Sequence, residues 1–330
     1  MKKSIVVVGG GTGTFTVLRG LKAYAGTVSI KAIVTMADDG GSNRVLRDEF
    51  GLLPTSGIRQ AIVALSTDEG LMRELFTYRY LRGKGIAGMT FGNLFMAALA
   101  DILKSQKRAI EETCELMGIV GEILPVSYKS TRLLATYMDG TEVLGEHLID
   151  EARGNVSKQR IIKLQTVPKA RISQEARHAL LTANLIVLGP GDLYTNTIAN
   201  LVIGGVKEAI VRSKARLVFV VNLMNKLGEA YQYRASDFLE DLARYIPRER
   251  VDYVLVNSDL DFDPKLLAAY KREGATPVED DLGEKWGKAE VIRAKFLSDV
   301  IPKAQKGDVV KRSMIRHHSK KLARVITGLI

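Results

Sequence analysis

Cysteine is almost missing from this chain of 330 residues, which contains Cys114 and no other. One cysteine excludes an internal disulfide framework, and no spacing of cysteine and histidine is typical of zinc ligands. Cys114 lies on a helical pattern between Ile110 and Met117, so we expect it to be a small buried hydrophobic side chain.

Long apolar runs are missing too. No segment approaches the ~20 consecutive apolar residues of a membrane-spanning helix. Met1-Lys2-Lys3 leads directly into a strand pattern, with no signal-peptide cleavage site after it. We therefore expect a cytoplasmic protein. With 46% hydrophobic and 26% charged residues, the composition is that of a globular protein with a sizeable core.

Positive charge is in excess, but aromatic residues are missing where it is densest. The formal net charge is +11, and Lys303–Arg324 contains eight Lys or Arg residues and one Asp. No aromatic residue interrupts that segment, which argues against the base stacking used to bind single-stranded nucleic acid. We therefore expect no nucleic-acid partner. The basic segment 303–330 is either a solvated tail or an arm that closes over a phosphorylated ligand.

Glycine, by contrast, gathers where apolar strands end, and the first such place organises the chain. Ser4–Val8 contains four consecutive β-branched residues and predicts a buried parallel strand. Gly9–Thr14 follows, and Thr12 or Thr14 is expected to cap the next helix. The N–H groups of such a turn and the helix dipole favour a phosphate. The candidate ligand-binding residues here are Gly10, Gly11, Thr12 and Gly13. The fingerprint G-x-G-x-x-G is incomplete, because Thr14 replaces its third glycine, and a ligand-free turn is the alternative.

Two adjacent acids follow the second predicted strand, Ser29–Val34. The segment Thr35–Ser42 contains Asp38 and Asp39 ahead of a glycine pair. In a doubly wound sheet, an acid at this place reaches a ribose hydroxyl, and a carboxylate here could instead hold Mg²⁺ beside a diphosphate. Simple capping of a polar turn is the third interpretation. We expect no required cofactor, and Asp38 or Asp39 is the candidate ligand for Mg²⁺.

A second glycine loop strengthens the case for a ligand site. The predicted strand Asn184–Leu188 ends in Gly189–Asn196. The candidate site residues of this loop are Gly189, Gly191, Leu193, Tyr194 and Thr195. Ligands of open α/β sheets bind at the carboxyl ends of the strands, so both glycine loops are predicted to share one edge. Leu217–Val221 and Val251–Val256 complete the predicted set of parallel strands.

The predicted fold is a single Rossmann-like, doubly wound α/β domain of residues 1–330 with a mainly parallel sheet. Residues from about 45 to 120 contain several helical patterns without a strand between them, which indicates a small helical insertion. Arg132–Met138 and Glu142–Leu144 predict a hairpin, and Ile161–Val167 predicts one more strand of a β-rich excursion.

Taken in order, these motifs resemble the gluconeogenesis-factor family, the YvcK-like branch of the wider CofD-like group. The matching segments are GGGTG at 9–13, TMADDGGS at 35–42, GNL at 92–94, GPGDLYT at 189–195, YQYRASD at 231–237, VNS at 256–258, ATPV at 275–278 and IRHHSKKLA at 315–323. The resemblance implies a Rossmann-like fold and a cytoplasmic regulatory protein. It further implies binding of UDP-sugars such as UDP-N-acetylglucosamine, and a role in cell shape and cell-wall metabolism during gluconeogenic growth. No catalytic activity is implied for this branch, whereas CofD itself is a Mg²⁺-dependent transferase that moves phospholactate from a guanosine diphosphate donor to a deazaflavin alcohol.

The resemblance also assigns residues. By it, Asn93 of the GNL segment belongs to the ligand site, and Tyr270 and Arg316 bind the UDP-sugar. A tyrosine ring suits packing on uracil or sugar, and an arginine fork suits a diphosphate. Ser319 falls where some relatives carry a phosphorylated threonine, so it is the candidate for phosphorylation, and a phosphate there would repel those of the ligand.

One departure from the family pattern bears on function. The family usually carries an acid and an amide after the Asp-Asp-Gly-Gly loop, and this chain has Gly57 and Gln60 there, although Arg59 remains. The departure weakens the transferase interpretation more than the binding one. A third interpretation, an NAD-dependent dehydrogenase, lacks the complete glycine fingerprint and an obvious histidine for hydride transfer. We expect a UDP-sugar or another nucleoside diphosphate as ligand, and a homodimer.

Overall fold

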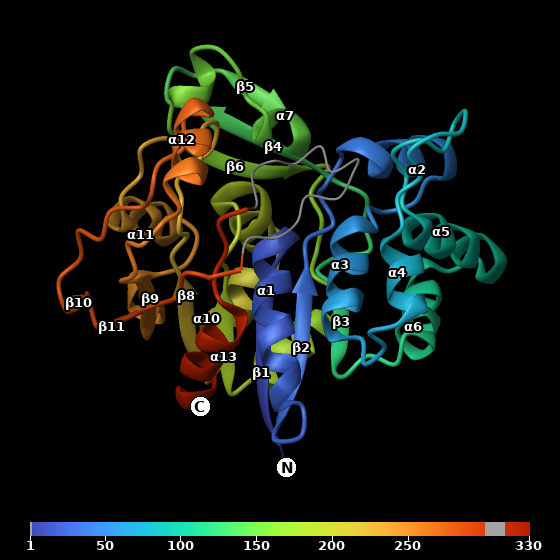
Figure 1. The fold of residues 1–330 in the computed structure, drawn as a ribbon, viewed down its shortest axis with the longest axis horizontal. Helices are drawn as coiled ribbons and strands as arrows, with labels where there is room; N and C mark the ends of the chain where they lie inside the picture. The colour runs from blue at the N-terminus through green and yellow to red at the C-terminus, as the bar shows by residue number, and fades with distance from the viewer. Residues whose placement is uncertain (1, 301–313) are drawn as a thin grey trace.

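The computed structural model describes residues 2–300 and 314–330, and its centre is one eight-stranded sheet (Figure 1). The strands of this sheet are β1 (Lys3–Gly9), β2 (Val28–Val34), β3 (Glu122–Pro125), β7 (Leu185–Leu188), β8 (Arg216–Val220), β9 (Tyr253–Asn257), β10 (Lys285–Trp286) and β11 (Ala289–Ala294). Their order is β10-β11-β9-β8-β7-β1-β2-β3. Neighbouring strands are parallel except for β10 and β11. The Rossmann-like α/β fold is therefore confirmed.

Strand β1 lies where the direction of winding changes. Its neighbours are β2 on one side and β7 on the other, and both pair with it in parallel. Ile5, Val6, Val7 and Val8 are fully buried, as the run of β-branched residues predicted. In a doubly wound sheet the crevice for a ligand opens at this switch point, beyond the carboxyl ends of the strands.

Helices cover both faces of the sheet. Helix α1 (Gly11–Leu21) and helix α13 (Ser319–Gly328) pack against each other, so segments from opposite ends of the described chain lie side by side (Figure 1). The other helices of the α/β body are α8 (Gln174–Thr182), α9 (Ala199–Leu201), α10 (Val206–Arg212), α11 (Ala235–Ala243) and α12 (Pro264–Arg272). Short helical turns are η1 (Lys22–Tyr24), η2 (Val156–Lys158), η3 (Leu193–Ile198, a π-helix) and η4 (Arg248–Arg250).

Five helices form the insertion between β2 and β3. They are α2 (Gly41–Phe50), α3 (Ser56–Leu65), α4 (Leu71–Thr77), α5 (Phe91–Leu103) and α6 (Gln106–Leu116). Asn93 ties three of them together at their N-terminal ends, because its amide donates to Ser42 and Ser56 at 3.1 Å each and accepts from Arg59 at 3.1 Å. Asn93 thus lies inside the insertion as a buried connecting residue.

The β-rich excursion is a separate three-stranded sheet, drawn above the main sheet in Figure 1. It consists of β4 (Arg132–Tyr137), β5 (Glu142–Leu144) and β6 (Ile161–Val167), with helix α7 (Glu146–Asp150) after the hairpin. The antiparallel pairing of β4 with β5 confirms the predicted hairpin, and β6 has the predicted bounds. This excursion brings α7 over the carboxyl edge of the main sheet (Figure 1).

Some local predictions are wrong. Thr12 and Thr14 do not cap α1, because the helix already begins at Gly11 with Gly10 as its N-cap, and both threonines lie within it. Strands β3, β10 and β11 were missed, since they are short or lie toward the sheet edges, where the apolar pattern is weak. Among the described helices, none has the length and apolarity that crossing a membrane would demand. The predicted basic segment is described only from residue 314 onward.

Candidate functional site

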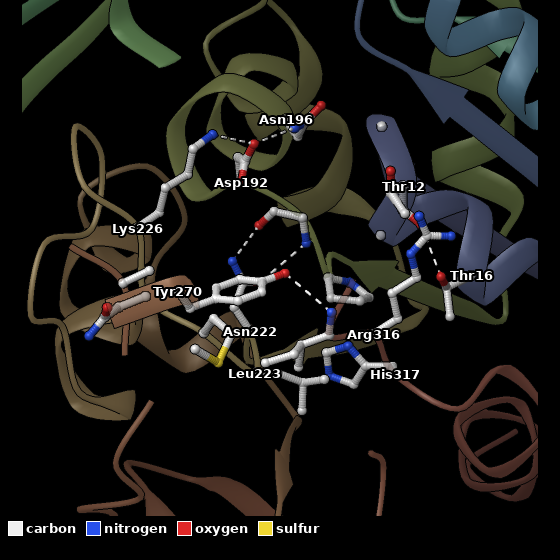
Figure 2. A pocket seen from close by; sticks show the side chains of 18 of the residues that line it. Thr12, Thr16, Asp192, Asn196, Asn222, Leu223, Lys226, Tyr270, Arg316 and His317 are labelled. Carbon is white, nitrogen blue, oxygen red and sulfur yellow. Dashed lines mark hydrogen bonds and ion pairs between the residues drawn. The ribbon is translucent and has the colours of Figure 1, made fainter. Parts of the chain in front are cut away.

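A cavity of about 260 Å³ opens at the switch point (Figure 2). It lies among the loops that follow β1, β7 and β8, helix α12, and the chain just before α13. The predicted site residues among its lining are Gly11, Thr12, Gly13, Gly191, Tyr270 and Arg316. The structure therefore brings six candidates from four distant segments together around one space.

The N-terminus of α1 is the anion-binding feature of this cavity. No side chain caps the helix, and Gly11 adopts a left-handed φ of 59°, which a residue without a Cβ adopts easily. The first helical residues, Gly11 and Thr12, line the cavity directly. Uncapped N–H groups and the positive end of the helix dipole at a cavity wall favour a negatively charged ligand group.

The second glycine loop is closed to such a ligand. Glu229 is 1% exposed, and its carboxylate accepts hydrogen bonds from the backbone N–H groups of Tyr194 at 2.8 Å and Thr195 at 3.2 Å. Thr195 also donates its hydroxyl to Glu229 at 2.6 Å. An internal carboxylate thus occupies the N-terminus of η3, where a phosphate would otherwise bind.

The predicted residues Leu193, Tyr194 and Thr195 are fully buried away from the cavity lining. Tyr194 donates its hydroxyl to Asp241 at 2.6 Å, which ties the second glycine loop to helix α11. Gly10 and Gly189 also lie outside the cavity lining, although the next residue in the chain after each of them, Gly11 and Pro190, belongs to it. These five positions shape the loops, and Gly191 is the predicted residue of the second loop that faces the space.

The two glycine loops touch. A Cβ atom placed on Gly13 would lie 2.1 Å from the carbonyl oxygen of Pro190, so only glycine allows this approach. Asn222, after β8, holds the same loop from the other side. Its amide accepts from the Gly191 N–H at 3.1 Å and donates to the Gly191 carbonyl at 2.8 Å. The prediction that both loops share one sheet edge is confirmed.

Three carboxylates surround the Lys226 ammonium beside the second glycine loop. We call the group of Lys226, Asp150, Asp192 and Glu229 the lysine cage. The Lys226 ammonium forms ion pairs with Asp150, with Asp192 at 2.7 Å and with Glu229 at 3.7 Å. Burial alone would lower the pKa of Lys226, but the three negative charges raise it, so the lysine stays charged. Burial raises the pKa of Glu229 to about 7.

Asp38 and Asp39 differ in what they do. Asp39 is 5% exposed and lies 3.3 Å from Arg132 and 3.7 Å from Arg47, and it accepts from the backbone N–H of His147 at 2.9 Å. Its carboxylate therefore fastens the excursion to the loop after β2. Burial raises the pKa of Asp38, and the charges of Asp39 and Asp150 add to this effect.

Glu146 of α7 lies near the carboxylates of Asp38 and Asp150. Burial raises its pKa well above the usual value, and the charges of Asp38 and Asp150 raise it further. Carboxylates that repel one another in this way favour a cation among them. Asp38 is accordingly the better of the two candidate metal ligands, because Asp39 already has two arginine partners.

Residues 314–318 close the cavity on the side of α13, and we call this segment the strap. Its Arg316 side chain points toward Thr12 and Thr16 at the start of α1 (Figure 2). His317 also lines the cavity, and burial lowers its pKa to about 4, so its imidazole is neutral. The strap thus adds one cation to the wall that carries the uncapped helix N-terminus.

Ser319, the first residue of α13, is 7% exposed, and the guanidinium of Arg19 donates to its hydroxyl at 3.4 Å. Its phosphorylation stays a prediction, and a kinase would reach the hydroxyl only if the start of α13 moved away from α1. Gly57 lies in helix α3 of the insertion, where a Cβ would come within 2.8 Å of the Val34 side chain, so an acid at this position would collide with the end of strand β2.

Sequence patterns missed several residues in and around the cavity. Asn222, Lys226 and Glu229 lie in no motif, and Glu146 and Asp150 lie on a short helix of the excursion. His317 lies within the motif at 315–323, but the motif gave it no role. The available signal was their place in the chain, since Asn222 and Lys226 follow a predicted parallel strand and must lie at the ligand-binding edge.

Comparison with known proteins identifies the relatives of this chain. The family model described as 2-phospho-L-lactate transferase CofD matches residues 5–297, which include most of β1, both glycine loops and the lysine cage. The chain belongs to the CofD family. This CofD-family protein is 34% identical to the gluconeogenesis factor of Bacillus subtilis over 330 residues, which cover 100% of this chain and 98% of the relative. It is 39% identical to the gluconeogenesis factor of Halalkalibacterium halodurans over 277 residues, 84% of either chain.

Solved structures agree with the fold. A crystal structure of a Bacillus halodurans protein, described as a member of the UPF0052 family, superposes with a TM-score of 0.87 at 35% identity and covers 99% of both chains. The resemblance to gluconeogenesis factors is confirmed along the whole length of this CofD-family protein.

Proposed function

We propose that this CofD-family protein binds a UDP-sugar, with UDP-N-acetylglucosamine as the expected ligand, in the cavity at the switch point. As a gluconeogenesis factor it would act as a cytoplasmic, homodimeric regulator of cell-wall metabolism and cell shape on gluconeogenic carbon sources. The names of its relatives support the part of this proposal that concerns gluconeogenesis.

One observation carries the ligand class. The uncapped N-terminus of α1 and the Arg316 side chain lie on the same side of the cavity (Figure 2). A diphosphate fits between them, because the helix supplies N–H donors and the arginine supplies charge-assisted hydrogen bonds. The second loop offers no competing anion site, since Glu229 fills it.

Titration calorimetry tests this proposal. UDP-N-acetylglucosamine should bind more tightly than GDP or NAD. Arg316→Ala should weaken it about tenfold to a hundredfold, because charge-assisted hydrogen bonds contribute about 1.5–3 kcal/mol. Arg324→Ala is the matched control, since Arg324 lies on the exposed face of α13. Equal losses in the two variants would mean that diffuse positive charge alone attracts the ligand, and weaker binding of the UDP-sugar than of GDP would overturn the ligand assignment.

The alternative function is a CofD-like, Mg²⁺-dependent transferase. The crowding of Asp38 and Glu146 beside Asp150 favours it, because burial and mutual repulsion raise the pKa of Asp38 and of Glu146, and a divalent cation would relieve that repulsion. In that case Mg²⁺ should strengthen nucleotide binding, and Asp38→Asn should abolish the effect. Asp39→Asn should keep it and lower the thermal stability instead. Affinity that is independent of Mg²⁺ in the unsubstituted protein would exclude this alternative.

A further inference from the structure

The hydroxyl of Tyr270 meets the backbone of the strap. Its oxygen accepts hydrogen bonds from the N–H groups of Met314 at 3.1 Å and Ile315 at 3.2 Å. These are the two residues directly before Arg316. The hydroxyl therefore fixes the backbone from which the arginine side chain extends toward α1 (Figure 2).

The strap is held on its other flank as well. The N–H of Ser298 donates to the carbonyl of Arg316 at 3.0 Å, and Leu297 forms a β-bridge with His317. Beyond the strap, α13 packs closely on α1, where a Cβ on Gly20 would lie 2.1 Å from the carbonyl of Ser319. Tyr270 therefore holds the strap from helix α12, whereas the Ser298 amide and the bridge to Leu297 hold it from the chain after β11.

Burial argues that the ring of Tyr270 does little stacking. The residue is 6% exposed, so little of its surface faces the cavity that it lines. Burial also raises its pKa, which keeps the phenol neutral. A ring that packed flat on a base would need an exposed face, whereas a hydroxyl that holds a loop is expected to be buried.

We propose that Tyr270 is a positioning residue, which acts on the ligand through Arg316 by fastening the strap with its hydroxyl. This inference rests on the proposed function of the cavity. It differs from the sequence-based expectation that the tyrosine ring packs against the uracil or the sugar. Through this contact, helix α12, which carries Tyr270, helps to set where the Arg316 guanidinium lies beside the start of α1.

Tyr270→Phe separates the two roles, because it keeps the ring and removes the acceptor. We expect it to weaken UDP-N-acetylglucosamine binding about three- to tenfold, because only part of the free energy of two ordinary hydrogen bonds is passed to the ligand through the strap. In the background of Arg316→Ala, the same change should have no further effect on affinity. Such non-additivity is the signature of a residue that acts through another.

Tyr245→Phe is the matched control. Tyr245 is a partly buried tyrosine whose hydroxyl also accepts from a backbone N–H, that of Leu164 at 2.8 Å, but it lies outside the cavity lining. Both Tyr→Phe variants should lower the thermal midpoint, and only Tyr270→Phe should lower affinity. Full affinity in Tyr270→Phe, with a loss only in Tyr270→Ala, would overturn the proposal in favour of ring packing, as would additive losses with Arg316→Ala.

A ligand-free measurement separates this proposal from the proposed function. Hydrogen exchange at the amides of Met314 and Ile315 should be faster in Tyr270→Phe than in the unsubstituted protein, because their acceptor is lost. Unchanged exchange would overturn the positioning role whatever the ligand proves to be. Faster exchange in a protein that binds no UDP-sugar would leave the strap anchored by Tyr270 and refute the ligand assignment alone.

Discussion

Gly13→Ala tests whether the contact between the two glycine loops builds the site. The new Cβ would lie 2.1 Å from the carbonyl oxygen of Pro190, 2.5 Å from its carbonyl carbon and 2.9 Å from the nitrogen of Gly191. All three atoms are backbone, so no side chain can rotate away. The loops must separate by about 1.4 Å, because the closest contact has to grow from 2.1 Å to about 3.5 Å.

Two opposing effects set the stability change. Alanine in a helix is favoured over glycine by about 1 kcal/mol, and Gly13 lies in the first turn of α1. Overpacking costs about 1–3 kcal/mol, so unfolding in urea should show a net loss of up to about 2 kcal/mol. Affinity should suffer more, because Gly11, Thr12 and Gly191 all line the cavity and move apart. We expect at least a tenfold loss in calorimetry.

Gly26→Ala provides the control for this experiment. A Cβ at Gly26 would have nothing within 4 Å, and its φ is not left-handed. Its stability should stay within about 0.5 kcal/mol or rise slightly, with unchanged affinity. If Gly13→Ala bound the UDP-sugar as tightly as Gly26→Ala, the loop contact would not shape the site and the reasoning would be refuted.

Two further predictions concern charge. Lys226→Met should destabilise the protein by about 3 kcal/mol in urea unfolding, because it leaves Asp150, Asp192 and Glu229 without their counter-charge; a change below about 0.5 kcal/mol would mean that the carboxylates are already neutral. His317 has its pKa lowered by burial from 6.5 to about 4, so the unfolded chain binds a proton between these values that the folded protein does not. Stability should therefore fall as the pH drops from 6.5 to 4, and His317→Asn should flatten this part of the pH profile. An unchanged slope in the variant would assign the acid sensitivity to other groups.

Local patterns predicted the frame of the site well. The run Ile5–Val8 and the two glycine segments depend on residues next to one another in the chain, so strand, turn and shared sheet edge could all be predicted. The direction of a side chain depends instead on distant packing. Tyr194 lies in the motif Gly189–Thr195, yet its hydroxyl bonds Asp241 of another helix, away from the cavity.

The lysine cage shows why the other residues of the site could not be predicted from the sequence. Its members come from the end of α7, the second glycine loop and the segment after β8, so no short motif contains them. Likewise, the sequence could not show that Glu229 fills one of two similar helix N-termini. Such a carboxylate is visible only once distant segments have been brought together.

The position of the strap near the C-terminal end of the chain means that the cavity is completed late in synthesis. The central sheet is complete once β11 ends at Ala294, whereas the cavity also needs the strap with Arg316 and His317. A chain whose synthesis stops between these points can build the sheet but lacks Arg316 beside the first glycine loop. Because a ligand stabilises only a chain that binds it, a nucleotide sugar would protect finished molecules from proteolysis and leave broken-off ones exposed.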